Sequence, residues 1–540
     1  MSLPARLVML AALSLGVCLV GVELMITAVA LPAIVPDLAD WTELRRASWI
    51  INGYLLAYVA VMPLAGRAAD RFALPTLFGA ALAVFASGSL LAGVAQDLDW
   101  LIGARVLQGA GAGAVVPLAT VGASHLFEGP ARARAIGVVG ALTFLGMALG
   151  PFLGALVLDH FHPAGGLGAL GLGWALAVDL FTPAWRWVFY LGAPFALLAG
   201  VYVWAAAPGW EAPRAGERLD VLGAGLFTTA LAAGLLALTL VGTEPPPGTP
   251  DSGLFAAVAG LAAAGALLRL WRASHPFIQP RFFRNRIFSG AVLLSLLTGY
   301  GFATAIIGGA VFVDRVRYAG ADEQQVALGA LAGMVALGAL GSGLLLRRLG
   351  GVLLSLVGIG ISIAGLLLLA QATPASGLEL LVAGLALFGL GFGLTVTARS
   401  TAAVEALGRR AYGLAAAAVT VARLMGMAVG LAALTVLGSN RIEALSVVLV
   451  DQPARDAILP PHLRGRPLQD YLVVDVLEAW AAGQAAEILS GLFLVAAGVT
   501  AAALLPALAM RGGAGPETFQ LEGEVAADGA QYGSPAGLAV

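Results

Sequence analysis

The sequence has few charged residues and almost no cysteine. Only 11% of its 540 residues are charged, every basic residue is an arginine, and Cys18 is the single cysteine. One cysteine excludes an intrachain disulfide and leaves a cysteine metal site without its other ligands. The net charge of −2 gives no basic surface for nucleic acid. We therefore expect neither a nucleic-acid partner nor a metal.

The histidines form no catalytic or metal-binding cluster within an apolar run. They stand at positions 125, 160, 162, 275 and 462, and only His160 and His162 are close in sequence. A membrane enzyme needs a nucleophile with a base, or a metal cluster. We expect no enzyme activity and no cofactor.

Long apolar runs are abundant instead. Hydrophobic residues make up 60% of the chain and its mean hydropathy is +0.92, which an aqueous fold of this size cannot bury. A membrane-spanning helix needs about 20 apolar residues. Fourteen runs reach this length, near 7–30, 48–66, 74–95, 101–124, 134–158, 186–207, 220–242, 254–271, 288–312, 325–346, 351–371, 378–398, 412–438 and 480–510.

The runs divide into two groups of six with a pair between them. They predict an all-α integral membrane protein with an N-terminal six-helix bundle at 1–207, a linker with two transmembrane helices and a cytoplasmic amphipathic segment at 208–287, and a C-terminal six-helix bundle at 288–510. Three further segments are an external insert at 159–184, an external extension at 439–479 and a disordered cytoplasmic tail at 511–540. Most arginines then fall on one side, which places both termini in the cytoplasm.

The fifth run, 134–158, is rich in glycine and contains a proline. It holds Gly137, Gly146, Gly150, Pro151 and Gly154. Small residues let membrane helices approach closely, and packing satisfies the backbone groups that proline frees. The run therefore predicts a kinked, closely packed helix. It resembles the antiporter motif in the fifth helix of major facilitator superfamily exporters, which implies an exporter.

A carboxylate stands in the first run, where Glu23 precedes Pro32 by nine residues. A carboxylate in hydrocarbon is costly, so it usually faces a cavity and exchanges protons. The stretch is similar to the first-helix motif of the drug:proton antiporters, with Glu in place of Asp. The alternative interpretation places Glu23 in water at the outer end of the helix.

The fourth run contains an arginine followed by a glutamine and glycines. Its residues Arg105, Gln108, Gly109, Gly111 and Pro117 match the R-x-x-Q-G-x-G motif of the same superfamily. A buried arginine that faces a titrating carboxylate favours its ionised form. We hypothesise that Glu23 carries a proton and that Arg105 tunes its release; a structural arginine bonded to carbonyls is the alternative.

The segment after the second run resembles the cytoplasmic gating motif of the superfamily. Gly66, Asp70 and Arg71 match it, whereas Leu74 and Pro75 stand where basic residues are usual. The resemblance implies a conformational gate with a shortened charge relay.

Two charged residues lie in the last two runs, Arg423 and Glu487. Exposure to lipid would be costly for both, so we expect them to point inward. They are predicted to pair, or Glu487 is predicted to be a second proton site, with an end-of-helix position for Glu487 as the alternative.

The chain resembles the fourteen-span drug:proton antiporter family in two features. These are the number of its apolar runs and the sequence Trp185-Arg186-Trp187 followed by Phe189. The external extension and stretches of the second and thirteenth runs are similar to its mycobacterial triacylglyceride exporters.

The resemblance implies a proton-coupled multidrug exporter of amphiphilic or lipophilic small molecules, working by alternating access as a monomer in the cell (inner) membrane. A lipid exporter of the same fold is the alternative, and a channel or sensor without proton counter-transport is a third. The predicted partners are protons, the lipid bilayer and a lipophilic or lipid substrate.

Overall fold

The structure, a computed structural model, consists of helices joined by turns and short connections in the residues that it describes, and it contains no strand there. The described residues are 2–38, 47, 49–160, 181–206, 220–240, 251–273, 280–408, 411–434, 438, 451–467 and 470–511. Most of the predicted insert at 159–184, the first part of the extension at 439–479 and nearly all of the tail at 511–540 lie outside them.

The predicted spans are found as helices. Thirteen helices of the described chain are long and apolar enough to cross a membrane. The predicted seventh span corresponds to α10 (Val221–Thr239), whose apolar part, Leu222–Leu238, is shorter than the others. The chain is therefore a multi-pass, all-α membrane protein, as its sequence predicts.

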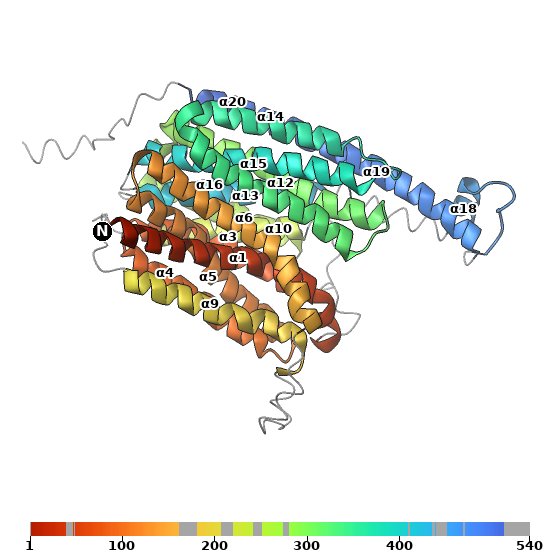
Figure 1. Cartoon of the computed structure of the whole chain (residues 1–540), viewed down its shortest axis with the longest axis horizontal. Helices are drawn as coiled ribbons and strands as arrows, with labels where there is room; N and C mark the ends of the chain where they lie inside the picture. Colours follow the sequence, from red (N-terminus) through yellow and green to blue (C-terminus); the bar gives the residue numbers. More distant parts are fainter. Residues whose placement is uncertain are drawn as a thin grey trace, which may run out of the picture.

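The helices form two groups that lie side by side (Figure 1). The first group comprises α1 (Leu3–Leu38), α3 (Trp49–Ala69), α4 (Leu74–Gly93), α5 (Leu98–Leu126), α6 (Gly129–His160) and α9 (Ala184–Ala206). The second comprises α12 (Arg286–Arg315), α13 (Ala321–Leu349), α14 (Gly351–Leu369), α15 (Leu378–Leu407), α16 (Tyr412–Leu434), α19 (Tyr471–Ala502) and α20 (Leu504–Ala509). Between them in sequence come α10, α11 (Ser252–Arg272) and a 3₁₀ turn at Pro280–Arg284.

The two ends of the molecule differ. At one end, here called the α1 end, α1 begins and α3, α5, α13 and α15 finish. At the opposite end α19 and the short helix α18 (Gln452–Ile458) project beyond the other helices (Figure 1). We call this opposite end the α18 end.

Short polar or glycine signals separate the apolar helices. Asp97 caps α5 by accepting the N–H of Trp100 at 2.8 Å, and Asp220 caps α10 by accepting the N–H of Gly223. Gly350, with φ of +76°, alone separates α13 from α14, because a glycine takes this conformation without a steric penalty.

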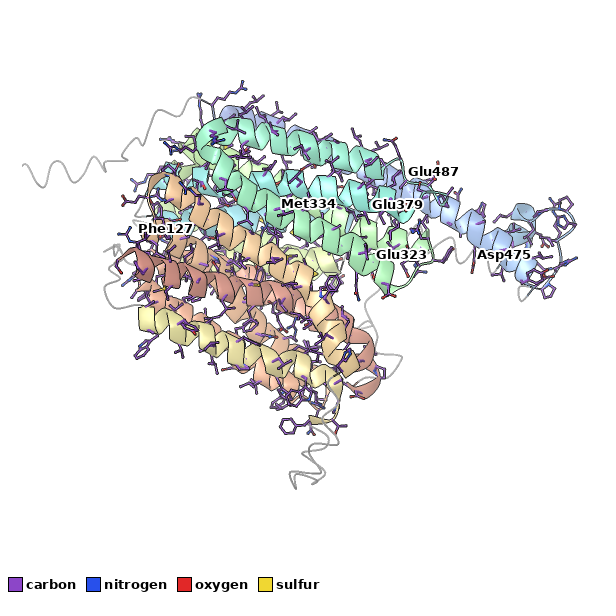
Figure 2. The ribbon with its side chains drawn as sticks, viewed as in Figure 1. Phe127, Glu323, Met334, Glu379, Asp475 and Glu487 are labelled. Carbon is purple, nitrogen blue, oxygen red and sulfur yellow. The ribbon has the colours of Figure 1, made fainter. Side chains whose placement is uncertain are left out.

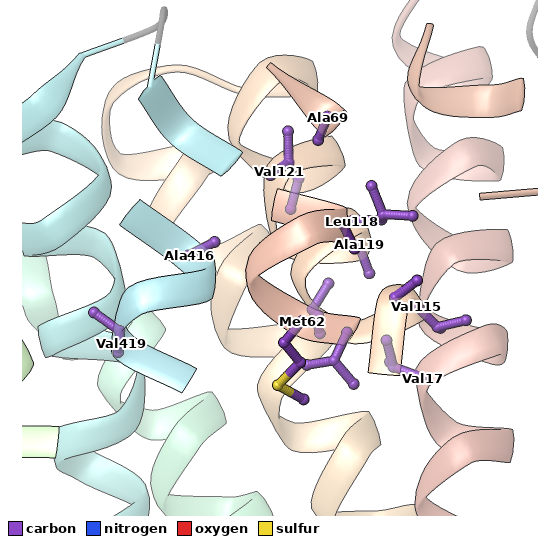
Figure 3. Packing of buried hydrophobic residues seen from close by; sticks show 14 of the residues in the cluster. Val17, Met62, Ala69, Val115, Leu118, Ala119, Val121, Ala416 and Val419 are labelled. Atoms are coloured by element: carbon purple, nitrogen blue, oxygen red, sulfur yellow. The ribbon is translucent and has the colours of Figure 1, made fainter. Parts of the chain in front are cut away.

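The groups meet at the α1 end through a shared apolar core. Figure 3 shows Ala416 and Val419 of α16 near Met62 of α3 and Val121 of α5, and all four residues belong to one buried cluster. The buried cluster nearer the α18 end of the first group, from Ile26 to Phe189, contains residues of that group only. Apolar burial therefore joins the groups at the α1 end, and a further cluster joins Ala141 and Phe144 of α6 to the second group.

Helix α15 extends well beyond its predicted span, 378–398. It continues to Leu407, so Arg399 lies inside the helix, where it is 1% exposed. The predicted span, which ends at 398, therefore stops one residue before a buried arginine.

Candidate functional site

Glu23 and Arg105 form a buried ion pair inside the first group. Arg105 Nη1 on α5 donates to Glu23 Oε1 on α1 at 2.8 Å. The two side chains are 1% and 2% exposed, respectively, so the alternative position of Glu23 in water does not hold. A buried carboxylate is tolerated when it is paired and hydrogen-bonded. The structure thus brings together the two residues that the sequence predicts as partners.

Arg105 is held from several sides. Its Nε donates to the Ile50 carbonyl at 3.2 Å, and its guanidinium lies 4.1 Å from the centroid of the Tyr54 ring. Gln108, three residues further along α5 and hence on the same face, accepts from Arg105 Nη1 and donates to Ser89 Oγ at 3.1 Å. This network fixes the guanidinium in front of the carboxylate. The bond to the Ile50 carbonyl also agrees in part with the alternative role, a structural arginine bonded to backbone carbonyls.

The glycines of the R-x-x-Q-G-x-G motif position α5. A Cβ added at Gly109 would overlap the backbone of Tyr54 on α3, and one at Gly111 would overlap the backbone of Phe85 on α4. Pro117 lies buried further along α5. Close approach on both sides places Arg105 within reach of α1.

The glycines of α6 pack against the helix that carries Glu23. A Cβ at Gly146 would overlap the Cys18 carbonyl oxygen, and one at Gly150 would lie 2.7 Å from the Val22 carbonyl oxygen. A Cβ at Gly154 would lie 3.1 Å from the Cγ1 atom of Ile26, and Pro151 lies within this stretch of α6. Small residues four apart let α6 contact the backbone of α1 directly.

Gly137 has a different partner. A Cβ there would lie 3.0 Å from the Ala339 carbonyl oxygen on α13 of the second group. Helix α6 therefore contacts the Glu23 helix through its later glycines and the second group through its first glycine.

The predicted gate joins the two groups at the α1 end. Asp70, which follows α3, accepts the backbone N–H groups of Gly413 at 2.7 Å and Leu414 at 3.1 Å. Both N–H groups belong to the first turn of α16, where the helix end attracts a carboxylate. A Cβ at Gly66 would overlap the Gly413 carbonyl, so the contact needs a glycine. Arg71 lies half-buried beside Phe72, with its guanidinium 5.6 Å from the ring centroid.

Burial raises the pKa of Asp70 to about 7, although the Gly413 and Leu414 N–H groups and the charge of Arg67 act in the opposite direction. The side chain is 5% exposed. A carboxyl group with this pKa changes its charge near neutral pH.

Glu487 and Arg423 are not brought together. Glu487 lies on the exposed face of α19, at the outer edge of the molecule in Figure 2. The Arg423 guanidinium on α16 lies 5.5 Å from the centroid of the Phe144 ring of α6. The predicted inward orientation therefore fails for Glu487, because α19 packs on α12 and α14 through its other face.

Sequence reasoning missed Arg399. Its Nη1 donates to Thr298 Oγ1 of α12 at 2.6 Å and to Thr395 Oγ1 of α15 at 3.1 Å. The sequence does place Thr395 and Arg399 four residues apart, and hence on one face of a helix that continues past its apolar run. This spacing could have indicated their hydrogen bond.

Comparisons with known proteins agree with this architecture. A family model described as the Major Facilitator Superfamily matches residues 13–431. A triacylglyceride transporter of Mycolicibacterium hassiacum is 33% identical over 416 residues, which are 74% of this chain and 73% of that protein. One of Mycolicibacterium smegmatis is 33% identical over 484 residues, 84% of this chain and 80% of that protein.

Among solved structures, a bacterial homologue of the human lysosomal transporter Spinster, in an inward-facing unoccupied conformation, is similar with a TM-score of 0.58 and 18% identity. The match covers 95% of this chain and 99% of that chain. The proton:xylose symporter XylE is similar with a TM-score of 0.52 and 13% identity, over 92% of this chain and 95% of that one. At these identities the likeness concerns the fold.

Proposed function

The chain belongs to the major facilitator superfamily, and we propose that it is a proton-coupled exporter of lipids that works by alternating access. It is a transporter and not an enzyme. The sequence motifs alone favour multidrug efflux over lipid export. Relatives named triacylglyceride transporters, which align with most of this chain and most of their own length, favour lipid export.

The buried pair of Glu23 and Arg105 carries the proposal of proton coupling. When Glu23 takes up a proton, Arg105 loses its counter-charge while it is still enclosed. Leaving one partner of a buried pair uncompensated costs about 3–5 kcal/mol. The protonated protein is thereby driven toward an arrangement in which Arg105 is hydrated or α1 has moved away from α5.

Helix α6 is placed to transmit such a movement. It contacts the backbone of α1 next to Glu23 through Gly146 and Gly150, and it contacts α13 through Gly137. A displacement of α1 therefore presses on a helix that also touches the second group. Glu487 is exposed on α19, so we assign the coupling to Glu23 and Arg105.

Three features close the α1 end. Asp70 binds the first turn of α16, Gly66 abuts Gly413, and the shared apolar core lies at the same end. We propose that this α1 end faces the cytoplasm of the cell membrane, as the arginine distribution predicts, and that the groups part at the α18 end for release.

The projecting helices suit the release of an apolar substrate. Leu459 and Leu463, which follow α18, pack on Val473 and Leu477 of α19 in a small separate core. This core holds the extension together beyond the other helices (Figure 1). We propose that it guides lipid away from the membrane surface.

The proposal is tested by reconstituting the full chain in liposomes with an imposed pH gradient and, in parallel experiments, a fluorescent triacylglycerol or a fluorescent phosphatidate in the bilayer. We expect gradient-driven transfer of at least one of these lipids to acceptor vesicles, lost in Glu23→Gln and retained in Glu487→Gln, a matched change of an exposed carboxylate. Equal transfer by the wild type and Glu23→Gln would remove Glu23 from the mechanism. Gradient-driven movement of a lipophilic cation without lipid would favour multidrug efflux, and transfer without any gradient would favour an uncoupled channel.

A further inference from the structure

We propose that Arg399 and Arg423 form an anion-binding site, so that the exported substrate carries a carboxylate or a phosphate group. This inference deepens the proposed function and rests on it. The site consists of the two arginines, Thr298 and the rings of Phe144 and Phe392.

The two arginines lack a negatively charged partner. Arg399 is 1% exposed, and the Nε atoms of both Arg399 and Arg423 are buried without a hydrogen-bond partner. In the described part of the chain, neither forms an ion pair. A buried cation without a counter-charge is strongly unfavourable, and within membranes such residues mark substrate or ion pathways. Arg105, by contrast, is neutralised by Glu23.

Two consecutive residues of α12 bring the arginines to the same level. The Arg399 Nη1 atom donates to the hydroxyl of Thr298 at 2.6 Å. Gly299 lets α16 approach so closely that a Cβ there would overlap the Arg423 carbonyl oxygen. Arg399 from α15 and Arg423 from α16 therefore flank α12 at one depth. Guanidinium groups bind carboxylate and phosphate oxygens in forked geometry, which suits a shared anion.

Aromatic rings form the apolar part of the site. The Arg399 guanidinium lies 5.0 Å from the Phe392 ring centroid, and that of Arg423 lies 5.5 Å from Phe144. The Phe144 and Phe392 centroids are 6.0 Å apart, and Phe302 stacks on Phe392 at 4.4 Å. Phe144, Phe302 and Phe392 are each 2% exposed or less, so the arginines border a packed aromatic cluster. Two positive charges at the edge of this cluster match the anionic headgroup of an amphiphile.

The site spans the boundary that opens during transport. Phe144 belongs to α6 of the first group, whereas Arg399, Arg423 and Phe392 belong to the second. A substrate held there contacts both groups and leaves one of them when they separate. The hydroxyls of Thr298 and Thr395 bond to Arg399 without neutralising it, so a purely structural role leaves the charge unexplained.

The test measures binding of three amphiphiles with one acyl chain to the full chain in a neutral detergent: monooleoyl glycerol, oleate and monooleoyl phosphatidate. We expect at least one anionic amphiphile to bind roughly tenfold or more tightly than the neutral one. The preference should fall to less than about threefold in Arg423→Gln and in Arg399→Gln, and Arg423→Lys should keep most of it. Arg347→Gln, an exposed arginine at the α1 end, is the matched control. Comparison of the affinities for oleate and for monooleoyl phosphatidate shows whether the site prefers a carboxylate or a phosphate.

Equal binding of neutral and anionic amphiphiles by the wild type would overturn the proposal. An anion preference that survives in Arg423→Gln would also overturn the proposal. If Arg399→Gln does not fold, the Arg423→Gln variant alone tests the site. Glu23→Gln should keep the anion preference while it loses gradient-driven transport. An anion preference without any proton-driven transport would therefore remove the proposed function and leave the binding site in place.

Discussion

Asp70 makes the closure of the α1 end dependent on pH. In the closed arrangement its carboxyl group is buried against the first turn of α16, and burial raises its pKa to about 7. When the groups part at this end, the carboxyl group enters water and its pKa returns toward the ordinary value of 3.8. The closed state therefore binds more protons than the open state at pH values between about 4 and 7.

The sign and size follow from linkage. A raised pKa of an acid means that closure is favoured at low pH and weakened as the pH rises through 7, with little further change above it. When the pH falls from 8 to 6, the ratio of closed to open molecules rises roughly tenfold. This corresponds to about 1.4 kcal/mol in favour of the closed state.

Distances between spin labels can measure this shift. Cys18 is the only cysteine, so a Cys18→Ser background permits labels at Phe72 and Leu349, which are both exposed at the α1 end. The fraction with the short distance should rise as the pH falls from 8 to 6, and Asp70→Asn should abolish the rise. Asp322→Asn, at the other end of α13, is the control. A rise of the same size in Asp70→Asn, or a fall with decreasing pH in the wild type, would refute the reasoning.

Two further predictions concern packing and capping. Gly146→Ala should lower the free energy of unfolding by about 1–3 kcal/mol, because its Cβ would overlap the Cys18 carbonyl. Thermal unfolding in detergent measures this loss. Gly491→Ala is the control and should cause no loss, because Gly491 faces open space on α19. Asp220→Ala should lower the free energy of unfolding by about 1 kcal/mol, because Asp220 caps α10 and its Oδ1 lies 3.0 Å from Arg269 Nε of α11. Amide hydrogen exchange in α10 should become faster in this variant. Unchanged exchange would contradict the prediction.

The sequence predicted the membrane fold well because hydropathy depends on composition along one helix. The pair of Glu23 and Arg105 was also predictable, since a carboxylate and an arginine in apolar runs each need a partner. The contacts of the glycines were not. Gly137 and Gly146 belong to one motif, yet one faces α13 and the other faces α1. Which helix a glycine meets depends on how whole helices are arranged, and no spacing within one run contains that information.

Arg399 shows a different limit of the sequence. An arginine just past an apolar run normally extends its long side chain to the membrane surface, so hydropathy ends the span before it. Here α15 continues for eight residues beyond Arg399, to Leu407, and the side chain bonds to Thr298 of another helix. Thr298 and Arg399 are far apart in sequence, so only the packing of α12 on α15 reveals that the charge is enclosed. A buried cation thus resembled a surface one, and it is this enclosure without a counter-charge that points to an anionic substrate.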